Sequence, residues 1–331
     1  MLDFLGIGAQ KAGTTWLFER LQKHPEIHFP HIKEISFWNA HYPRSLKDAD
    51  YKKNINWYRS LFNHWEEDAS PEMARVVEAA LTELPALPEY KRGWFDQVMA
   101  GLDRTSGQAV ALHSLEVVRE EKIEVVPKLG EISPTYCYFE DPAVLPKIRE
   151  FAPDVRIIYI VRHPFDRAWS SAQMAIKRSE MTPDEASDQW YIDQMRSYLS
   201  QKYGNYPRAL ADWHAAFPKE QILLMRFEDI PVDPQGFLRR ACEHIGVEDT
   251  TFFDKVAPEK LAQKVFSGTG AELRPSLLPV LHELYDAQID ALKADFGIDY
   301  TRYPLVASDT VPKKQQVKVD NAENKRRNKK K

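Results

Sequence analysis

The chain has 331 residues but only two cysteines, Cys137 and Cys242, which lie far apart in the sequence. Neither belongs to a pair with metal-site spacing, so we expect neither a disulfide framework nor a zinc site. Long apolar runs are also absent, since none approaches the roughly 20 residues that a membrane-spanning helix needs. The first residues lack the basic lead-in that begins a secretory signal. With 43% hydrophobic residues, the composition is that of a globular protein, which we expect in the cytoplasm.

Charge is distributed unevenly along the chain. Residues 313–331 hold nine Lys or Arg against two acids, a local charge of +7, whereas the other 312 residues carry 36 basic and 47 acidic side chains, or −11. The terminal segment has too few apolar residues to offset the entropy cost of ordering, so residues 306–331 are expected to form a basic disordered tail. A solubilising role is favoured over a contact with nucleic acid or an anionic surface, and no specific nucleic acid is expected as a partner.

The rest of the chain alternates between β-type and helical patterns. Continuous apolar or β-branched runs predict strands at 3–9, 155–161 and 221–230, and amphipathic spacing predicts helices at 14–24, 165–178, 236–247 and 274–297. Glu131, Ser133 and Tyr136 fall on a strand end or loop, because Pro134 interrupts regular structure there. This order predicts an α/β fold with a central parallel sheet flanked by helices. We expect one domain over residues 1–305, with a helical insert at about 70–126.

Ligands of such sheets bind where strands end and helices begin, and two loops meet that condition. The first is the GAQKAGTT stretch at 8–15, where a glycine turn leads from a strand into a helix. Its backbone amides, two hydroxyls and Lys11 suit a phosphate or sulfate. In the usual nucleotide-triphosphate loop the lysine follows the second glycine, whereas Lys11 precedes Gly13. No acidic run typical of a magnesium-holding strand is evident, so no metal is expected.

The second loop follows the strand at 155–161. Arg162 leaves that strand, and Ser170 comes eight residues later in the following helix. An arginine fork with a hydroxyl is a suitable receptor for a phosphate dianion. Taken alone, Arg162 could equally pair with a carboxylate at the end of the sheet.

Six segments together resemble the sulfotransferases that use 3′-phosphoadenosine 5′-phosphosulfate (PAPS), in particular the branch of heparan sulfate sulfotransferases and their bacterial relatives. The segments are 8–17, 33–42, 55–62, 130–136, 157–170 and 227–238. The resemblance implies a sulfotransferase fold related to P-loop proteins and PAPS as the sulfuryl donor. It also implies two groups of donor-binding residues: Lys11, Ala12, Gly13, Thr14, Thr15 and Trp16 around the 5′-phosphosulfate, and Arg162 with Ser170 around the 3′-phosphate. Gly270 and Arg274 stand where the family has a loop that closes over the nucleotide.

The resemblance also implies catalytic roles. Lys11 would stabilise negative charge on the leaving phosphate, and Glu34 would act as general base, with His41 as the reserve base. We expect the aromatic neighbours Phe37 and Trp38 to desolvate the Glu34 carboxylate and raise its pKa. Without the family pattern, Glu34 beside Lys33 would be a solvated ion pair.

The acceptor is less defined. The candidate acceptor-binding residues are Trp38, His41 and Tyr42. The aromatic residues of this stretch either line an acceptor pocket or belong to the core, and they are Trp38, Tyr42, Trp57 and Tyr58. Ile132 replaces a lysine usual in the heparan-modifying enzymes, and the body is acidic, so a carbohydrate, glycolipid or small-molecule alcohol or amine is favoured over a polyanion. Two other functions remain open: a magnesium-dependent kinase or other phosphoryl transferase, and a non-catalytic anion-binding protein. The oligomeric state is left open.

Overall fold

The computed structural model describes residues 2–30, 33–39, 58, 127–141, 143–179, 181–265 and 269–304. The expected insert at 70–126 and the expected tail at 306–331 lie outside these residues. His41, Tyr42 and Trp57 lie outside them as well.

A five-stranded parallel sheet forms the centre of the molecule, in the order β2-β3-β1-β4-β5. Its strands are β1 (Phe4–Gly8), β2 (Ile27–His28), β3 (Lys128–Ile132), β4 (Arg156–Val161) and β5 (Ile222–Arg226). Strand β1 is buried throughout and β4 is buried from its second residue on, which explains their unbroken apolar sequences. The expected central parallel sheet is therefore confirmed.

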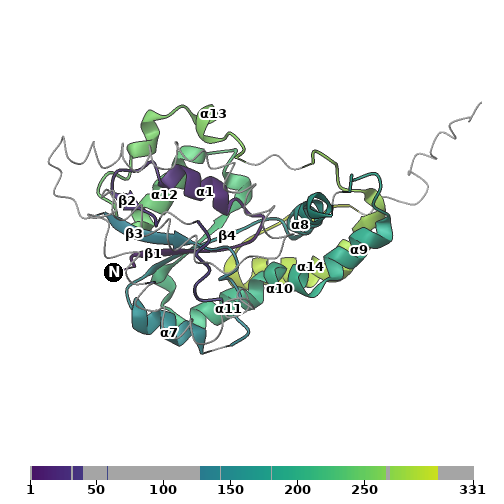
Figure 1. The fold of residues 1–331 in the computed structure, drawn as a ribbon, viewed down its shortest axis with the longest axis horizontal. Helices are drawn as coiled ribbons and strands as arrows, with labels where there is room; N and C mark the ends of the chain where they lie inside the picture. The colour runs from purple at the N-terminus through teal and green to yellow at the C-terminus, as the bar shows by residue number, and fades with distance from the viewer. Residues whose placement is uncertain are drawn as a thin grey trace, which may run out of the picture.

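Helices cover both faces of this sheet (Figure 1). Helices α1 and α12 lie on one face, α7 and α11 lie on the other, and α8, α9 and α14 extend beyond the carboxyl ends of the strands. The helix bounds are α1 (Thr14–Leu21), α7 (Val144–Phe151), α8 (Pro164–Arg178), α9 (Asp188–Arg196), α10 (Tyr198–Gly204), α11 (Tyr206–Ala216), α12 (Pro234–Ile245), α13 (Pro258–Leu261) and α14 (Leu278–Phe296). Short 3₁₀ turns occur at Lys219–Gln221, Phe227–Asp229, Phe252–Lys255 and Pro275–Leu277.

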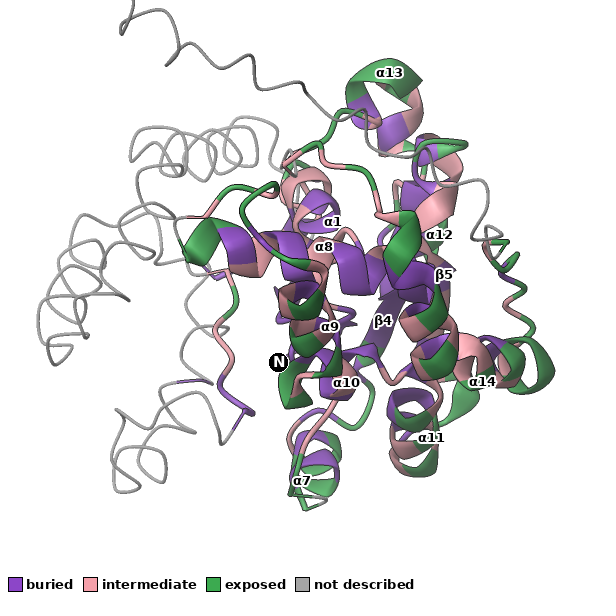
Figure 2. Ribbon diagram, turned by 90° about the vertical axis from the view of Figure 1, so that its right-hand side faces the viewer, coloured by how far each residue is buried: buried purple, intermediate pink, exposed green. Residues whose placement is uncertain are grey.

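The buried side of α8 holds the helix against the rest of the core. Phe165, Ala168, Ala172 and Ile176 are buried at helical spacing, and the helix begins with proline directly after β4. Buried residues line the strands and the inward sides of the flanking helices (Figure 2). Because α8 follows β4 so closely, its first turn is fixed at the carboxyl edge of the sheet.

The elements differ from the sequence expectations in several places. The unanticipated elements are strand β2 and helices α7, α9, α10, α11 and α13, and residues 227–229, expected at the end of a strand, form a 3₁₀ turn after Arg226. The helix expected at 14–24 ends at Leu21. The helices closed by Gly246 and Gly297 end where expected, because both glycines adopt left-handed dihedrals.

Candidate functional site

The loop after β1 turns sharply before α1 begins. Lys11 and Gly13 have left-handed dihedrals, with φ of 71° and 87°. A Cβ at Gly13 would lie 2.9 Å from the ring of Phe227, so both conformation and space favour glycine there. Helix α1 then starts at Thr14, and the first amides of a helix have no partner within it. The loop therefore places Lys11 and the positive end of α1 at the carboxyl edge of the sheet.

Arg162 reaches the same edge from the neighbouring strand. Its Nη1 donates a hydrogen bond to the Lys11 carbonyl at 3.1 Å, and its guanidinium lies 4.6 Å from the centre of the Phe227 ring. The structure thus brings the two loops that the sequence singled out into direct contact. Phe227, which sequence reasoning missed, packs against both of them.

Three cations repel the Lys11 ammonium, and together with it we call them the cationic cluster: Lys11, Arg162, Lys177 and Arg178. Burial lowers the pKa of Lys11, and the charges of Arg162, Arg178 and Lys177 lower it further, whereas Glu34 opposes them. An ammonium that is withdrawn from water and surrounded by like charges favours an anion beside it. The cluster is therefore suited to a ligand with several negative charges.

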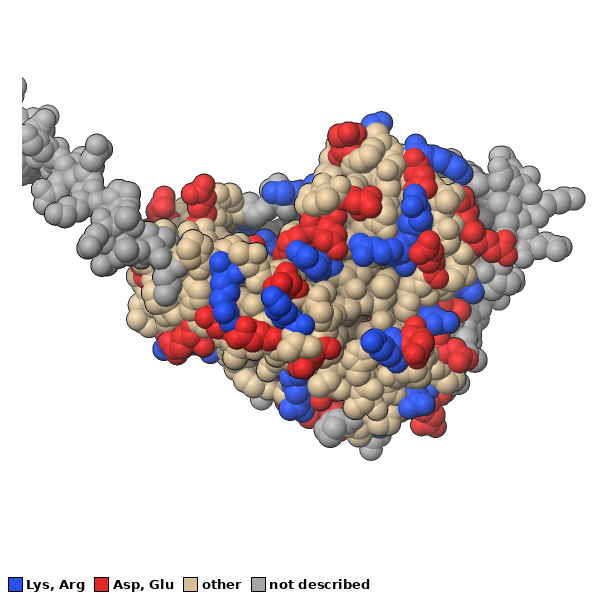
Figure 3. Space-filling model, turned by 180° about the vertical axis from the view of Figure 1, so that it is seen from behind, with Lys and Arg blue, Asp and Glu red and all other residues tan. Residues whose placement is uncertain are grey.

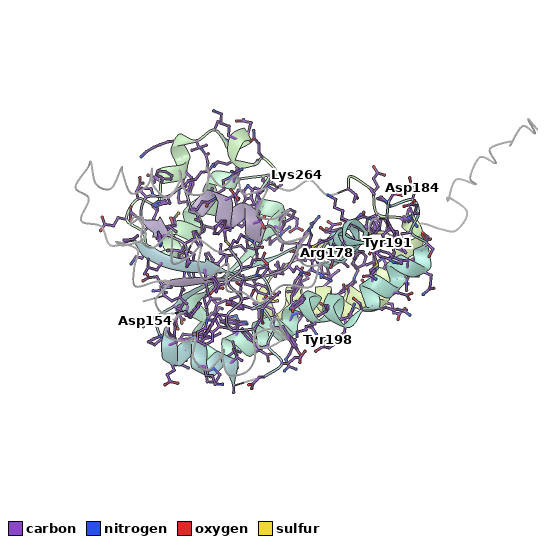
Figure 4. All side chains as sticks on the ribbon, in the orientation of Figure 1. Asp154, Arg178, Asp184, Tyr191, Tyr198 and Lys264 are labelled. Carbon is purple, nitrogen blue, oxygen red and sulfur yellow. The ribbon has the colours of Figure 1, made fainter. Side chains whose placement is uncertain are left out.

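Sequence reasoning did not single out Lys177 and Arg178. They lie at the carboxyl end of α8, where Figure 4 labels Arg178. The sequence did contain a signal that places them on the same helix face as Ser170. The spacing i, i+4, i+7 and i+8 joins Ser170, Met174, Lys177 and Arg178. Ser170 itself is half-buried and lies six residues, or roughly 9 Å along the axis, beyond the start of α8. Its contact with a 3′-phosphate stays a prediction.

Other residues assigned to the donor are buried or partly buried. Ala12 is fully buried, Thr14 is buried at the start of α1 and Thr15 is half-buried. The Trp16 indole is also buried and donates a 2.6 Å hydrogen bond to the Leu261 carbonyl. Trp16 therefore could contact a donor only through its main chain.

Gly270 and Arg274 belong to a segment that packs on α8 and α9. Gly270 has a left-handed φ of 78°. The Arg274 guanidinium pairs with Asp188 at 2.6 Å, donates to the Pro183 carbonyl and lies 4.6 Å from the centre of the Tyr191 ring. These contacts hold Arg274 within the protein, and its role in closing over a nucleotide stays a prediction.

Glu34 does not have the environment that the sequence suggested. Its side chain is 37% exposed and forms a 2.9 Å ion pair with Lys33. Phe37 and Trp38 turn inward and pack with Tyr58, so they do not enclose the Glu34 carboxylate. The expected desolvation by these aromatic residues was therefore wrong. Glu34 is nevertheless close enough to Lys11 to act on its pKa.

Trp38 is 4% exposed and lies in an aromatic cluster with Phe37, Tyr58 and Phe151. The aromatic stretch was expected either to line an acceptor pocket or to belong to the core, and for Trp38 these contacts support the core. Its role in acceptor binding stays a prediction, as do those of His41 and Tyr42.

Glu131, which was placed only at a strand end, is a buried acid with several partners. It is 2% exposed at the end of β3, and its carboxylate accepts hydrogen bonds from two tyrosines, a serine and a main-chain amide. Burial raises its pKa, and these hydrogen bonds oppose that shift. Sequence reasoning missed this role, because two of the four partners, Ser36 and Tyr58, are remote in the chain.

These features define a parallel α/β protein with a cationic edge at the carboxyl ends of its strands. Among solved structures it resembles a sulfotransferase from Alicyclobacillus acidocaldarius, with a TM-score of 0.52 and 22% identity, over 91% of this chain and 97% of that one. The model of the sulfotransferase family matches residues 4–251. The chain therefore belongs to the sulfotransferase family, which confirms the resemblance and the fold expected from the sequence.

Two curated relatives extend this comparison. Mouse heparan sulfate glucosamine 3-O-sulfotransferase 3A1 is 23% identical over 248 residues, which cover 73% of this chain and 45% of that protein. A membrane-associated sulfotransferase of Dictyostelium discoideum is 41% identical over 61 residues, covering 18% of this chain and 12% of the relative. The chain thus spans less than half the length of these relatives. In the part of the chain that the structure describes, no helix combines the length and hydrophobicity needed to cross a bilayer.

Proposed function

We propose that the protein transfers a sulfuryl group from PAPS to a hydroxyl or amine of a carbohydrate, glycolipid or small-molecule acceptor. The observation that carries this proposal is the contact between Arg162 and Lys11 within the cationic cluster. Family membership supplies the reaction class. Because this contact brings the two loops together, residues proposed to bind the 5′-phosphosulfate and the 3′-phosphate lie close enough to hold the same donor molecule.

The charge of the donor suits this edge. PAPS carries a 5′-phosphosulfate and a 3′-phosphate, roughly four negative charges at neutral pH. In the proposed assignment Lys11 and the start of α1 hold the phosphosulfate, and Arg162 with Ser170 holds the 3′-phosphate. Negative charge beside Lys11 would reverse the effects that lower its pKa. The ammonium would then be fully charged when the reaction needs it.

In the reaction the bond between sulfur and the 5′-phosphate oxygen breaks while a bond forms between sulfur and the acceptor oxygen or nitrogen. The electron pair stays on the leaving phosphate oxygen, where Lys11 stabilises the growing charge. The acceptor proton goes to the Glu34 carboxylate. Two features support Glu34 as the base: its electrostatic effect on Lys11 and its exposure, which leaves the carboxylate accessible to an acceptor.

Donor binding separates this proposal from a kinase. Adenosine 3′,5′-bisphosphate should raise the melting temperature of the protein, whereas ATP with Mg²⁺ should not. Turnover of sulfur-labelled PAPS should continue in the presence of a chelator. Stabilisation by ATP with Mg²⁺ alone would support a phosphoryl transferase. Binding of the bisphosphate with no label transfer to any acceptor would support a non-catalytic relative.

Glu34→Gln tests the base. The substitution keeps the size of the side chain but removes the proton acceptor, so kcat should fall about 10²- to 10⁴-fold while the affinity for adenosine 3′,5′-bisphosphate stays the same. Glu259→Gln, on the exposed surface of α13, is the matched control and should leave kcat unchanged. If Glu34→Gln retains full turnover and His41→Asn does not, His41 is the base.

The proposed acceptor class rests on charge. Residues 1–312 carry a net charge of −11, and Lys and Arg are interspersed with Asp and Glu on the face seen from behind in Figure 3. A neutral carbohydrate, glycolipid or small alcohol suits such a surface better than a polyanion. A panel of sugars, lipids and phenols, with heparan sulfate as the anionic member, tests this by transfer of labelled sulfur. Preferential labelling of heparan sulfate would contradict it.

A further inference from the structure

Glu131 is a buried carboxylate whose described hydrogen-bond partners are all neutral. Its Oε1 accepts from Ser133 Oγ at 2.6 Å, from the Tyr136 hydroxyl at 2.8 Å and from the Ser36 amide at 3.2 Å. Its Oε2 accepts from the Tyr58 hydroxyl at 2.6 Å. A buried charge without a cationic partner is costly unless hydrogen bonds satisfy it. Four donors from three segments of the chain provide them.

One of these donors belongs to the segment that carries Glu34. The Ser36 amide lies two residues beyond Glu34 and also donates to Ser133 Oγ at 3.1 Å. Further along, the Trp38 amide donates to the Tyr136 hydroxyl at 3.2 Å, and the Asn39 side chain donates to Thr135 Oγ1. Residues 36–39 are therefore attached to the loop that follows β3, with Glu131 at the centre of the contacts.

The backbone around Glu34 needs such support. Glu34 and Ser36 have φ of 61° and 55°, in the left-handed region that residues other than glycine seldom adopt. Such residues persist when their surroundings determine the conformation. Among the described residues, the exposed Glu34 side chain forms an ion pair with its neighbour Lys33. The buried hydrogen bonds at Ser36 thus contribute strongly to the direction in which Glu34 leaves the chain.

We propose that Glu131 is a positioning residue for the reaction: its buried carboxylate holds the Ser36 amide and so aims the Glu34 carboxylate at the acceptor. This inference rests on the proposed function, in which Glu34 is the base. Strand β3 lies beside β1, with Glu131 paired to Leu5, so the same sheet edge carries Glu131 and the loop of Lys11. The arrangement links the position of the base to that of the donor loop through one strand pair.

Two substitutions at Glu131 separate geometry from charge. Glu131→Asp keeps the charge but withdraws the carboxylate by one methylene from Ser36. Glu131→Gln keeps the length, and its carbonyl oxygen can still accept from Ser36 while its NH₂ group donates to the rotatable hydroxyl of Tyr58. We expect kcat to fall about 10- to 100-fold in Glu131→Asp and less than tenfold in Glu131→Gln. The dissociation constant of adenosine 3′,5′-bisphosphate should change less than twofold in both.

A double-mutant cycle tests whether Glu131 acts through Glu34. If it does, Glu34→Gln combined with Glu131→Asp is no slower than Glu34→Gln alone, because there is no longer a base to position. If the reduction in kcat of the double variant equals the product of the reductions in the two single variants, the proposal is overturned. A lower melting temperature of Glu131→Asp with unchanged kcat would also overturn it, because the role would then be structural only.

Amide hydrogen exchange gives a readout that does not depend on activity. Exchange at Ser36 and Trp38 should accelerate at least about tenfold in Glu131→Asp and stay close to the wild-type rate in Glu131→Gln. Unchanged exchange in Glu131→Asp would overturn the positioning claim. If exchange accelerates but Glu34→Gln retains full turnover, the assignment of Glu34 as base fails, and with it the catalytic part of the claim.

Discussion

Lys11 and Glu131 are both withdrawn from water, and they lie near the ends of neighbouring strands, yet their surroundings differ in kind. Glu131 is enclosed by four neutral hydrogen-bond donors, which oppose but do not cancel the rise of its pKa on burial. Lys11 is partly buried among Arg162, Arg178 and Lys177, which lower its pKa. The buried carboxylate has its hydrogen-bond donors within the fold, whereas the ammonium is repelled by three cations and attracted by one carboxylate, that of Glu34.

This difference separates two uses of a buried charge. A matched charge stabilises a particular arrangement of the chain, and its removal leaves buried donors without acceptors. A charge held among like charges destabilises the free protein and is favoured only when an anion binds. We therefore expect removal of the two charges to affect folding with opposite signs.

Glu131→Ala should have the largest effect on folding. It leaves buried hydroxyls and the Ser36 amide without their shared acceptor and opens a cavity, so the free energy of unfolding should fall by about 3 to 5 kcal/mol. Urea denaturation measures this loss. Glu259→Ala on the exposed surface of α13 is the control, with an expected change within about 0.5 kcal/mol. If the free energy of unfolding of Glu131→Ala falls no more than that of the control, the expected difference between the Glu131 and Lys11 charges is contradicted.

Lys11→Met should separate folding from function. In the proposed reaction the variant loses the ammonium that stabilises the leaving phosphate, so kcat should fall about 10²- to 10³-fold. Its free energy of unfolding should equal or exceed that of the wild type, because a repelled and partly buried charge is gone. Lys23→Met, at an exposed position just beyond α1, should leave both quantities unchanged. Parallel losses of stability and turnover in Lys11→Met would contradict this view of the site.

Arg162→Lys should affect binding more than folding. Lysine keeps the charge but loses the planar fork that can bind a phosphate with two hydrogen bonds, so the dissociation constant of adenosine 3′,5′-bisphosphate should rise about 10- to 100-fold. Isothermal titration calorimetry measures it. Arg208→Lys is the control, because Arg208 is exposed on α11 and pairs with Asp212 one helical turn away. Equal affinities for the wild type and Arg162→Lys would show that Arg162 does not hold the 3′-phosphate.

The fold and the position of the cationic cluster at the sheet edge could be predicted from local patterns. Strands β1 and β4 are continuous apolar runs, and Gly13 marks a turn that side chains do not fit, so both loops were identified without knowledge of the strand order. The parallel sheet then brings the ends of adjacent strands together. The contact of Arg162 with the Lys11 carbonyl is the direct result.

The remaining features depend on contacts that no local pattern contains. Ser36 and Tyr58 reach Glu131 across 95 and 73 residues of sequence, and the glutamate alone does not reveal them. The environment of Glu34 was predicted incorrectly for a related reason. The aromatic residues that follow Glu34 in the sequence were expected to cover its carboxylate. They turn toward Tyr58 in the core instead and leave the carboxylate exposed.

The smallest expected effect is a pH dependence of donor binding that comes from Lys11. Its pKa in the folded protein lies below the ordinary lysine value of about 10.4, so the ammonium loses its proton at a lower pH than in the unfolded chain. Affinity for adenosine 3′,5′-bisphosphate should therefore fall as pH rises through the lowered pKa, by at most about tenfold per pH unit. Titrations in buffers of different ionisation enthalpy should show proton uptake on binding in that range.

Stability should respond to pH with the opposite sign. Below the lowered pKa, Lys11 is protonated in both the folded and the unfolded chain, and the cost of burying the ammonium is fully present. Between that pKa and the ordinary lysine value, the unfolded chain binds more protons, so the contribution of Lys11 to the free energy of unfolding rises with pH. Lys11→Met should abolish both the fall in affinity and this rise. If either dependence survives in Lys11→Met, another group titrates, and Lys11 is not the destabilised charge that distinguishes this edge from the surroundings of Glu131.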